Sequence, residues 1–108
     1  MNILTKYEEI LLISIYKLNK EAYGARLKSY IFETTGKDWN YGNLYCTLDQ
    51  LVKKKYIVKS TGEPTPERGG RSKNFYTVTN YGLDVLKESM KLNYALWDGI
   101  KEIIPGTN

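Results

Sequence analysis

The sequence predicts a mostly helical α+β fold in a single domain, and the order of its segments leads to this class. Three amphipathic helical segments come first, two short β-type segments joined by a basic turn come next, and a long helical segment follows. The length of 108 residues is that of one domain. We divide the chain into a body of residues 1–79 and a last helix with its tail, residues 80–108.

The first two helices have clear signals at their ends. Thr5-Lys6-Tyr7-Glu8 matches a capping box, in which a threonine and a glutamate three residues apart satisfy free backbone amides. The first helix is therefore expected over about residues 6–18, where apolar residues recur at helical spacing. The second is expected to begin near Tyr23-Gly24 and to end around Thr35-Gly36, because glycine readily adopts the left-handed conformation after a helix.

The third helix has two faces of different chemistry. Asn40 is a favourable N-cap, and Trp39 just before it is expected to pack as a hydrophobic staple. At about 100° per residue, one stripe is expected to face the core: Leu44, Tyr45, Leu48, Leu51 and Val52. The opposite face carries small or hydrogen-bonding side chains and lysines: Asn43, Cys46, Gln50 and Lys54, flanked by Thr47 and Lys53.

Two β-type segments, residues 56–58 and 74–78, enclose a polar connection of 15 residues, 59–73, that contains glycines and prolines. This pattern predicts a β-hairpin with Arg68, Arg71 and Lys73 at its tip. Residues 53–73 hold seven basic and two acidic residues, a net charge of +5. Because the whole chain has a net charge of +4, the other 87 residues sum to −1. Positive charge concentrated in this way favours a polyanionic partner.

A helix with an exposed polar face followed by a basic hairpin is the layout of a winged helix-turn-helix domain, which binds double-stranded DNA. Asn43, Thr47 and Gln50 can hydrogen-bond to base edges, and asparagine and glutamine suit adenine. Gly42 lets the backbone approach a phosphate near the helix start, and the Tyr45 hydroxyl is expected to reach the DNA backbone. The hairpin tip is expected to touch phosphate or to enter the minor groove. The expected DNA-contacting residues are Asn40, Tyr41, Gly42, Asn43, Tyr45, Thr47, Gln50, Lys53, Lys54, Arg68, Arg71 and Lys73.

The last helix is expected over about residues 80–104, with Thr79 as its N-cap and Pro105-Gly106 after its end. One side of it is apolar through Leu83, Leu86, Met90, Tyr94, Trp97 and Ile104. The other side is apolar through Val85, Leu92, Leu96 and Ile103. A helix of about 25 residues spans roughly 37 Å, longer than the body can cover, so its second side predicts a homodimer.

With these residues in view, the chain resembles the PadR-like winged-helix transcriptional regulators of bacteria, from Thr5 to about Ile104. The resemblance rests on Tyr23-Gly24, on Gly42-Asn43-Leu44-Tyr45 with Leu48 and Leu51, and on residues 70–82, Gly70-Arg71-Ser72-Lys73-Asn74-Phe75-Tyr76-Thr77-Val78-Thr79-Asn80-Tyr81-Gly82. It implies a dimeric repressor that binds a palindromic operator, in the short branch of the family with a single C-terminal dimerisation helix.

The resemblance also implies a ligand, because some members of that branch bind planar drugs between aromatic residues of the two last helices. Here Met90, Tyr94 and Trp97 would line such a site. Two positions depart from the family pattern. Lys55 stands where the family usually has glycine, and Asn93 stands where the aromatic residue that stacks on the drug usually falls.

Other classes receive less support. Catalysis and cofactors are not expected, because the chain has no histidine, metal-ligand cluster, phosphate-binding glycine loop or nucleophile with a base at motif spacing. No apolar run approaches the roughly 20 residues that span a bilayer. Without a signal-peptide pattern, and with one cysteine, the chain is expected to be cytoplasmic and away from membranes.

Two alternatives stay open. The winged helix could be a protein-interaction module without a DNA target, although such a module has no need of a strongly basic hairpin. Cys46 could be a redox-sensitive thiol, but it is better explained as a small neutral residue that faces DNA.

Overall fold

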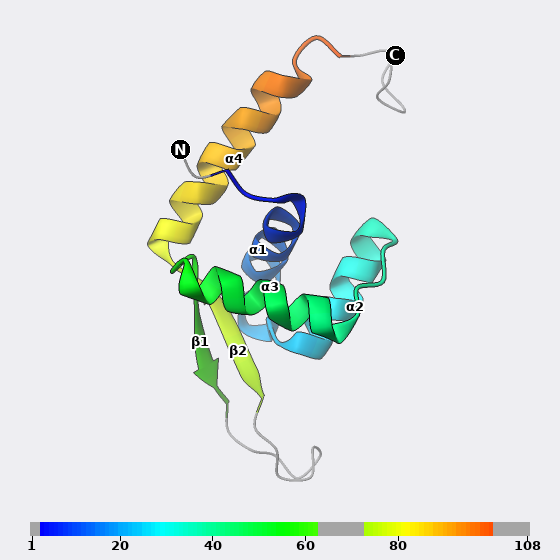
Figure 1. Ribbon diagram of the computed structural model, residues 1–108, viewed down its shortest axis with the longest axis vertical. Coiled ribbons are helices and arrows are strands. Elements are labelled where there is room, and N and C mark those ends of the chain that lie inside the picture. The colour runs from blue at the N-terminus through cyan, green and yellow to red at the C-terminus, as the bar shows by residue number, and fades with distance from the viewer. Residues whose placement is uncertain (1–2, 63–72, 101–108) are drawn as a thin grey trace.

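The computed structural model describes residues 3–62 and 73–100 (Figure 1). Within them the chain forms the helices α1 (Lys6–Leu18), α2 (Gly24–Thr35), α3 (Tyr41–Lys53) and α4 (Asn80–Trp97), the 3-10 turn η1 (Asn19–Glu21) and the strands β1 (Ile57–Thr61) and β2 (Asn74–Val78). The hairpin extends from one end of α3, and α4 leads away from the body on the other side (Figure 1). The α+β class and the presence of a C-terminal helix are confirmed.

Local signals place the starts of α1 and α3 and the end of α2 where the sequence predicts them. In the capping box of α1, the Glu8 amide donates to Thr5 Oγ1 at 3.1 Å, and the Thr5 amide donates to Glu8 Oε1 at 2.9 Å. Asn40 Oδ1 accepts from the Asn43 amide at 2.7 Å at the start of α3. Gly36 ends α2 with a φ of 75°, a left-handed conformation that glycine adopts without strain.

The core surrounds α1, which contacts α2, α3, β2 and α4. Its largest fully buried apolar residues come from α1, α2, α3 and β1: Leu11, Leu12, Ile15, Leu27, Ile31, Leu44, Leu48, Leu51 and Ile57. Trp39, just before α3, belongs to the same cluster. Its ring meets the Tyr7 ring edge-on, with centroids 5.0 Å apart. The apolar stripes therefore meet around one central helix.

The hairpin is longer than the sequence predicts. Strand β1 pairs antiparallel with β2 from Ile57 opposite Val78 to Thr61 opposite Asn74. The polar residues 59–61 were assigned to the connection, but the backbone ladder with β2 holds them in a strand whatever their side chains. The Tyr76 amide also donates to the Ala22 carbonyl at 2.9 Å, which fastens the hairpin to the start of α2.

A tight junction joins α3, the hairpin and α4. Lys55 has a φ of 65°, so the position where the family usually has glycine is left-handed here as well. Thr79 caps α4 through the Gly82 amide at 2.9 Å, and its hydroxyl donates to the Lys55 carbonyl at 2.7 Å. A Cβ at Gly82 would overlap the Tyr56 carbonyl oxygen, so glycine is required for α4 to start this close to the body.

Two expectations about α4 are wrong. The helix ends at Trp97 rather than near Ile104, because Asp98 turns to an extended conformation and Gly99 has a φ of 83°. Its 18 residues span roughly 27 Å, less than the expected length. Val85, assigned to the side awaiting a partner, is 4% exposed and belongs to the core, because the Thr79 junction turns that side toward the body. Residues 103 and 104 lie outside the described residues.

Candidate nucleic-acid interface

The expected base-reading face of α3 is exposed beside the hairpin. Asn43, Cys46 and Gln50 are exposed, and Thr47 is half-buried. The Thr47 hydroxyl donates to the Asn43 carbonyl at 2.9 Å, which leaves its oxygen lone pairs as acceptors. Figure 1 shows α3 running across the body toward the hairpin, so the two elements can face one partner together.

The first turn of α3 presents Gly42 without a side chain, and Gly42 is exposed. The side-chain oxygen of Asn40 is already used as the helix cap, where it accepts from the Asn43 amide. Asn40 was expected to contact DNA, and this bond fixes its side chain while leaving the amide nitrogen as a donor to an outside acceptor.

Two tyrosines form an exposed pair on α3. The Tyr41 and Tyr45 rings are stacked, with centroids 6.1 Å apart and planes 22° apart. The assignment of Tyr45 to the core stripe is wrong, because it is 43% exposed. Its hydroxyl lies over Gly24, where any Cβ would overlap it. Because Gly24 has no side chain, the Tyr45 hydroxyl can lie against the start of α2.

Lys53 and Lys54 differ sharply although they are adjacent. Lys53 is exposed and has no ion-pair partner in the part of the chain that the structure describes. Lys54 donates to Glu8 Oε2 at 2.5 Å. The hydrogen bond to the Glu8 carboxylate raises the pKa of Lys54. Lys54 was expected to contact DNA, and the structure instead commits it to a buried carboxylate.

Of the three basic residues predicted at the hairpin tip, Lys73 lies among the described residues. Arg68 and Arg71 lie outside the described residues. Lys73 precedes Asn74 at the connection end of the β1–β2 ladder, with its Nζ 3.6 Å from the centroid of the Tyr23 ring. That ring in turn meets Phe75 edge-on at 5.6 Å. This cation–π contact places the ammonium group of Lys73 beside the start of α2.

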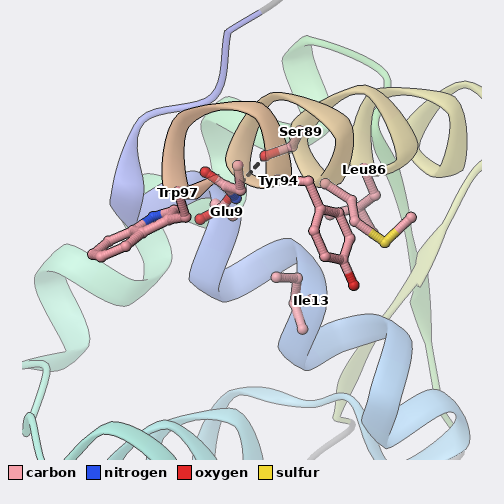
Figure 2. Close-up of a pocket in the computed structure, with 8 residues that line it drawn as sticks. Glu9, Ile13, Leu86, Ser89, Tyr94 and Trp97 are labelled. Carbon is pink, nitrogen blue, oxygen red and sulfur yellow. Dashed lines mark hydrogen bonds between the residues drawn. The ribbon is translucent and has the colours of Figure 1, made fainter. Parts of the chain in front are cut away.

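A groove between α1 and α4 contains all three residues expected to bind an effector (Figure 2). Its volume is about 470 Å³, and it is lined by Glu9, Ile13, Leu86, Ser89, Met90, Asn93, Tyr94 and Trp97. Trp97 is 54% exposed, so its ring is open to a partner. The sequence did not point to Glu9 or Ile13, because they lie on α1, roughly 80 positions away along the chain.

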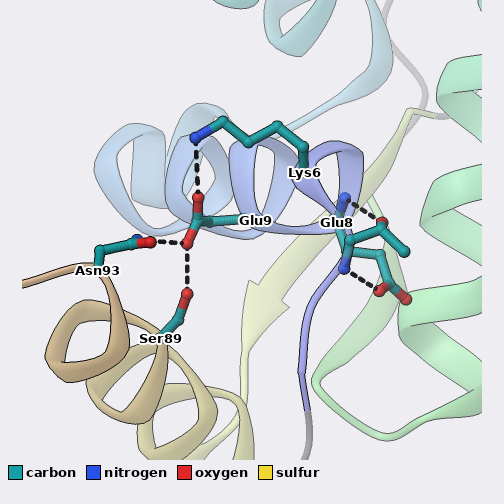
Figure 3. A network of polar contacts seen from close by, with 6 residues as sticks. Lys6, Glu8, Glu9, Ser89 and Asn93 are labelled. Carbon is teal, nitrogen blue, oxygen red and sulfur yellow. Dashed lines mark hydrogen bonds and ion pairs between the residues drawn. The ribbon is translucent and has the colours of Figure 1, made fainter. Parts of the chain in front are cut away.

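Glu9 is the polar centre of this region (Figure 3). Its Oε2 accepts from the Ser89 hydroxyl and from Asn93 Nδ2, the latter at 2.9 Å, while Lys6 Nζ lies 3.3 Å from its Oε1. Burial raises the pKa of Glu9, but the hydrogen bonds from Ser89, Asn93 and Lys6 lower it more, and the net pKa is below 4.5. Asn93, where an aromatic was expected, therefore ties α4 to α1.

The comparisons with known proteins agree with this architecture. Residues 12–88, well over half of the chain, match the family described as transcriptional regulator PadR-like. The chain therefore belongs to the PadR-like family of transcriptional regulators. No curated protein matches the sequence. Among residues 3–62 and 73–100, no helix is long and apolar enough to cross a membrane.

Solved structures resemble the chain over most of its length. RosR of H. salinarum is 29% identical with a TM-score of 0.65, and the match covers 89% of this chain and 79% of RosR. A PadR-like transcription factor from Bacteroides fragilis is 18% identical with a TM-score of 0.74, covering 91% of this chain and 89% of that one. A PadR-like regulator from Bacillus cereus is 23% identical with a TM-score of 0.66, covering 83% and 82%. The last two show a shared fold.

The contact between Tyr45 and Gly24 can be tested by substitution. Gly24→Ala is expected to destabilise the protein by about 1–3 kcal/mol, because the new methyl group collides with the Tyr45 hydroxyl. Combining it with Tyr45→Ala should remove most of this penalty. Gly42→Ala is the control, since a Cβ there meets only Asn40 Oδ1, at 3.3 Å. Urea unfolding of Gly24→Ala, Tyr45→Ala, their double variant and Gly42→Ala measures the effects, and additive losses in the double variant would contradict the contact.

The two carboxylates of α1 predict a loss of stability in acid. Burial raises the pKa of Glu8, but the hydrogen bonds from Lys54 and Thr5 lower it by more than burial raises it. The pKa of Glu8 therefore lies below its ordinary value. A lowered folded-state pKa gives stability that is complete above the unfolded-state value and is lost as pH falls through the folded-state value. The free energy of unfolding should therefore fall as the pH drops below the ordinary glutamate pKa. Glu8→Gln should flatten this dependence, and Glu88→Gln, on the exposed side of α4, should not.

Proposed function

We propose that this PadR-like regulator is a DNA-binding repressor that binds a palindromic operator as a homodimer in the cytoplasm. The observation that carries the proposal is the exposed polar face of α3 beside the hairpin. The net charge of +5 in residues 53–73 adds to it. Phosphate neutralisation by such a segment supplies much of the affinity of DNA-binding proteins, and base contacts add the specificity.

In this proposal each element has its own role. Asn43, Thr47 and Gln50 read base edges in the major groove. Arg71 and Lys73 neutralise phosphate, as do Arg68 and Lys53, with Tyr41, Gly42 and Tyr45 close to the DNA backbone. The exposed apolar residues of α4 support dimer formation: Met90, Tyr94, Leu96 and Trp97. Two α3 helices held in one dimer would meet half-sites about one helical turn apart.

Selection of duplexes from a random pool tests DNA binding directly. The wild-type protein is expected to enrich a palindrome and to bind it with a strong dependence on salt. Arg71→Ala with Lys73→Ala should weaken binding to every duplex and flatten the log–log salt slope by roughly two units. Gln50→Ala should relax the preference at particular base pairs. If no duplex is enriched, the alternative of a protein-interaction module without a DNA target is favoured.

The dimer is tested by charges placed on α4. Met90→Glu with Leu96→Glu should convert a dimer at micromolar concentration to a monomer, because the carboxylates would be buried without partners. Both positions are more than half exposed in the single chain, so the monomer should still fold. Lys91→Glu, between them on an exposed position, is the control. Sedimentation velocity measures the state, and a monomeric wild type would contradict the dimer.

The proposal includes release from DNA by a small planar effector in the groove between α1 and α4. Tyr94, Met90 and Trp97 offer aromatic and sulfur surfaces for stacking. A planar cationic dye should quench the fluorescence of Trp97 and weaken binding to the selected duplex. Trp39→Phe removes the only other tryptophan, which is buried, and should leave the quenching intact. If Trp97→Ala quenches as the wild type does, the groove is not the site.

A further inference from the structure

Lys54 and Glu8 are joined across 46 positions of the sequence. Glu8 lies in the first turn of α1 and is 2% exposed. Its Oε1 accepts from the Thr5 amide at 2.9 Å, and its Oε2 accepts from Lys54 Nζ at 2.5 Å. Lys54 is the C-cap residue of α3, the helix proposed to read DNA. The pair therefore fixes the last turn of α3 to the central helix.

The burial of Glu8 determines what Lys54 is free to do. A buried carboxylate is strongly destabilising when its partner is withdrawn, whereas an exposed lysine binds phosphate without such a loss. The Lys54 side chain is 48% exposed, but if it moved away from α1 toward a phosphate it would leave Glu8 without its charged partner. Lys53, one residue earlier, is exposed and has no ion-pair partner among the described residues.

The first turn of α1, to which Lys54 is bound, is also bonded to α4. Glu9, the residue after Glu8, is hydrogen-bonded to Ser89 and Asn93 on α4 (Figure 3). The first turn of α1 is therefore fastened to α3 on one side and to α4 on the other. In the proposed dimer, α4 sets the distance between the two α3 helices. The bonds that connect α4 to α3 through α1 therefore govern how the two α3 helices align with their half-sites on DNA.

We infer that Lys54 is a positioning residue for DNA recognition and not a phosphate contact: through Glu8 it holds the end of α3 at the angle that sequence-specific binding requires. The inference rests on the proposed function. Phosphate contacts add affinity for every duplex, whereas the alignment of α3 matters only where base edges are read. Lys54 should therefore affect the preference for the selected palindrome over an unrelated duplex, and Lys53 should affect both duplexes alike.

Matched methionine variants separate the two roles, because methionine removes the charge and keeps an unbranched side chain. Affinities for the selected palindrome and for an unrelated duplex are measured over a series of salt concentrations. Lys53→Met should weaken both complexes by the same factor and flatten the salt slope by about one unit. Lys54→Met should leave the slope and the unrelated duplex unchanged and lower the preference about tenfold. Equal weakening of both complexes with a flattened slope would overturn the inference.

Glu8→Gln gives the sharper test, because it keeps the charge of Lys54. Glutamine at this position still satisfies the capping box, so α1 retains its start. A lysine released from Glu8 would bind phosphate at least as well as before, so a phosphate contact predicts equal or tighter binding to both duplexes. A positioning role predicts a loss of preference like that of Lys54→Met, and no further loss in the double variant. Unchanged preference in Glu8→Gln overturns the inference alone, whereas a wild type without any preference overturns the proposed function as well.

Discussion

Two consecutive carboxylates in the first turn of α1 connect the three helices on which the proposed function depends. Glu8 is buried and reaches Lys54 at the end of α3, and Glu9 reaches Ser89 and Asn93 on α4. Charged groups in a protein interior need partners, so their positions restrict where the partner helices can lie. Apolar packing around α1 brings the helices together, and these bonds fix their angles and registers.

The junction after α3 imposes the second constraint. The left-handed Lys55 reverses the chain, and the Thr79 hydroxyl donates to its carbonyl from the start of α4. A non-glycine residue in this conformation costs about 1 kcal/mol. The hydrogen bonds at Thr79 and the close approach permitted by Gly82 offset that cost. The reading helix, the hairpin and the last helix thus meet at one short stretch of backbone.

Features set by neighbours in the sequence were predictable, and features set by distant contacts were not. The capping box of α1, the Asn40 cap and the Gly36 end depend on residues at most four positions apart, and each is confirmed. A helical wheel gives the angles between side chains of one helix but not the side that faces the body. For that reason the environments of Val85 and Tyr45 were misassigned.

The ion pair of Lys54 with Glu8 could not be predicted for a related reason. On the wheel it shares a face with Asn43 and Gln50, and only a contact across 46 positions shows that it is bound to Glu8. The exposed candidates on α3 could be named from the sequence because polar residues on a wheel face opposite the core are usually solvated. Their partners on other elements could not, because the sequence alone does not say which elements meet.

The groove between α1 and α4 illustrates how one position limits another. Asn93 stands where the family resemblance places an aromatic, and here it donates to Glu9 at 2.9 Å. A phenylalanine at this position could not make that bond, so the Asn93–Glu9 hydrogen bond and a phenylalanine ring exclude each other at residue 93. Trp97, one turn later, supplies an aromatic ring to the groove instead, and the Glu9 carboxylate lines the same groove. In the proposed effector site, a cation stacked on Trp97 would compete with Lys6, Ser89 and Asn93 for that carboxylate. Binding would then weaken the attachment of α4 to α1, which is the contact that holds the proposed reading helices at a fixed distance.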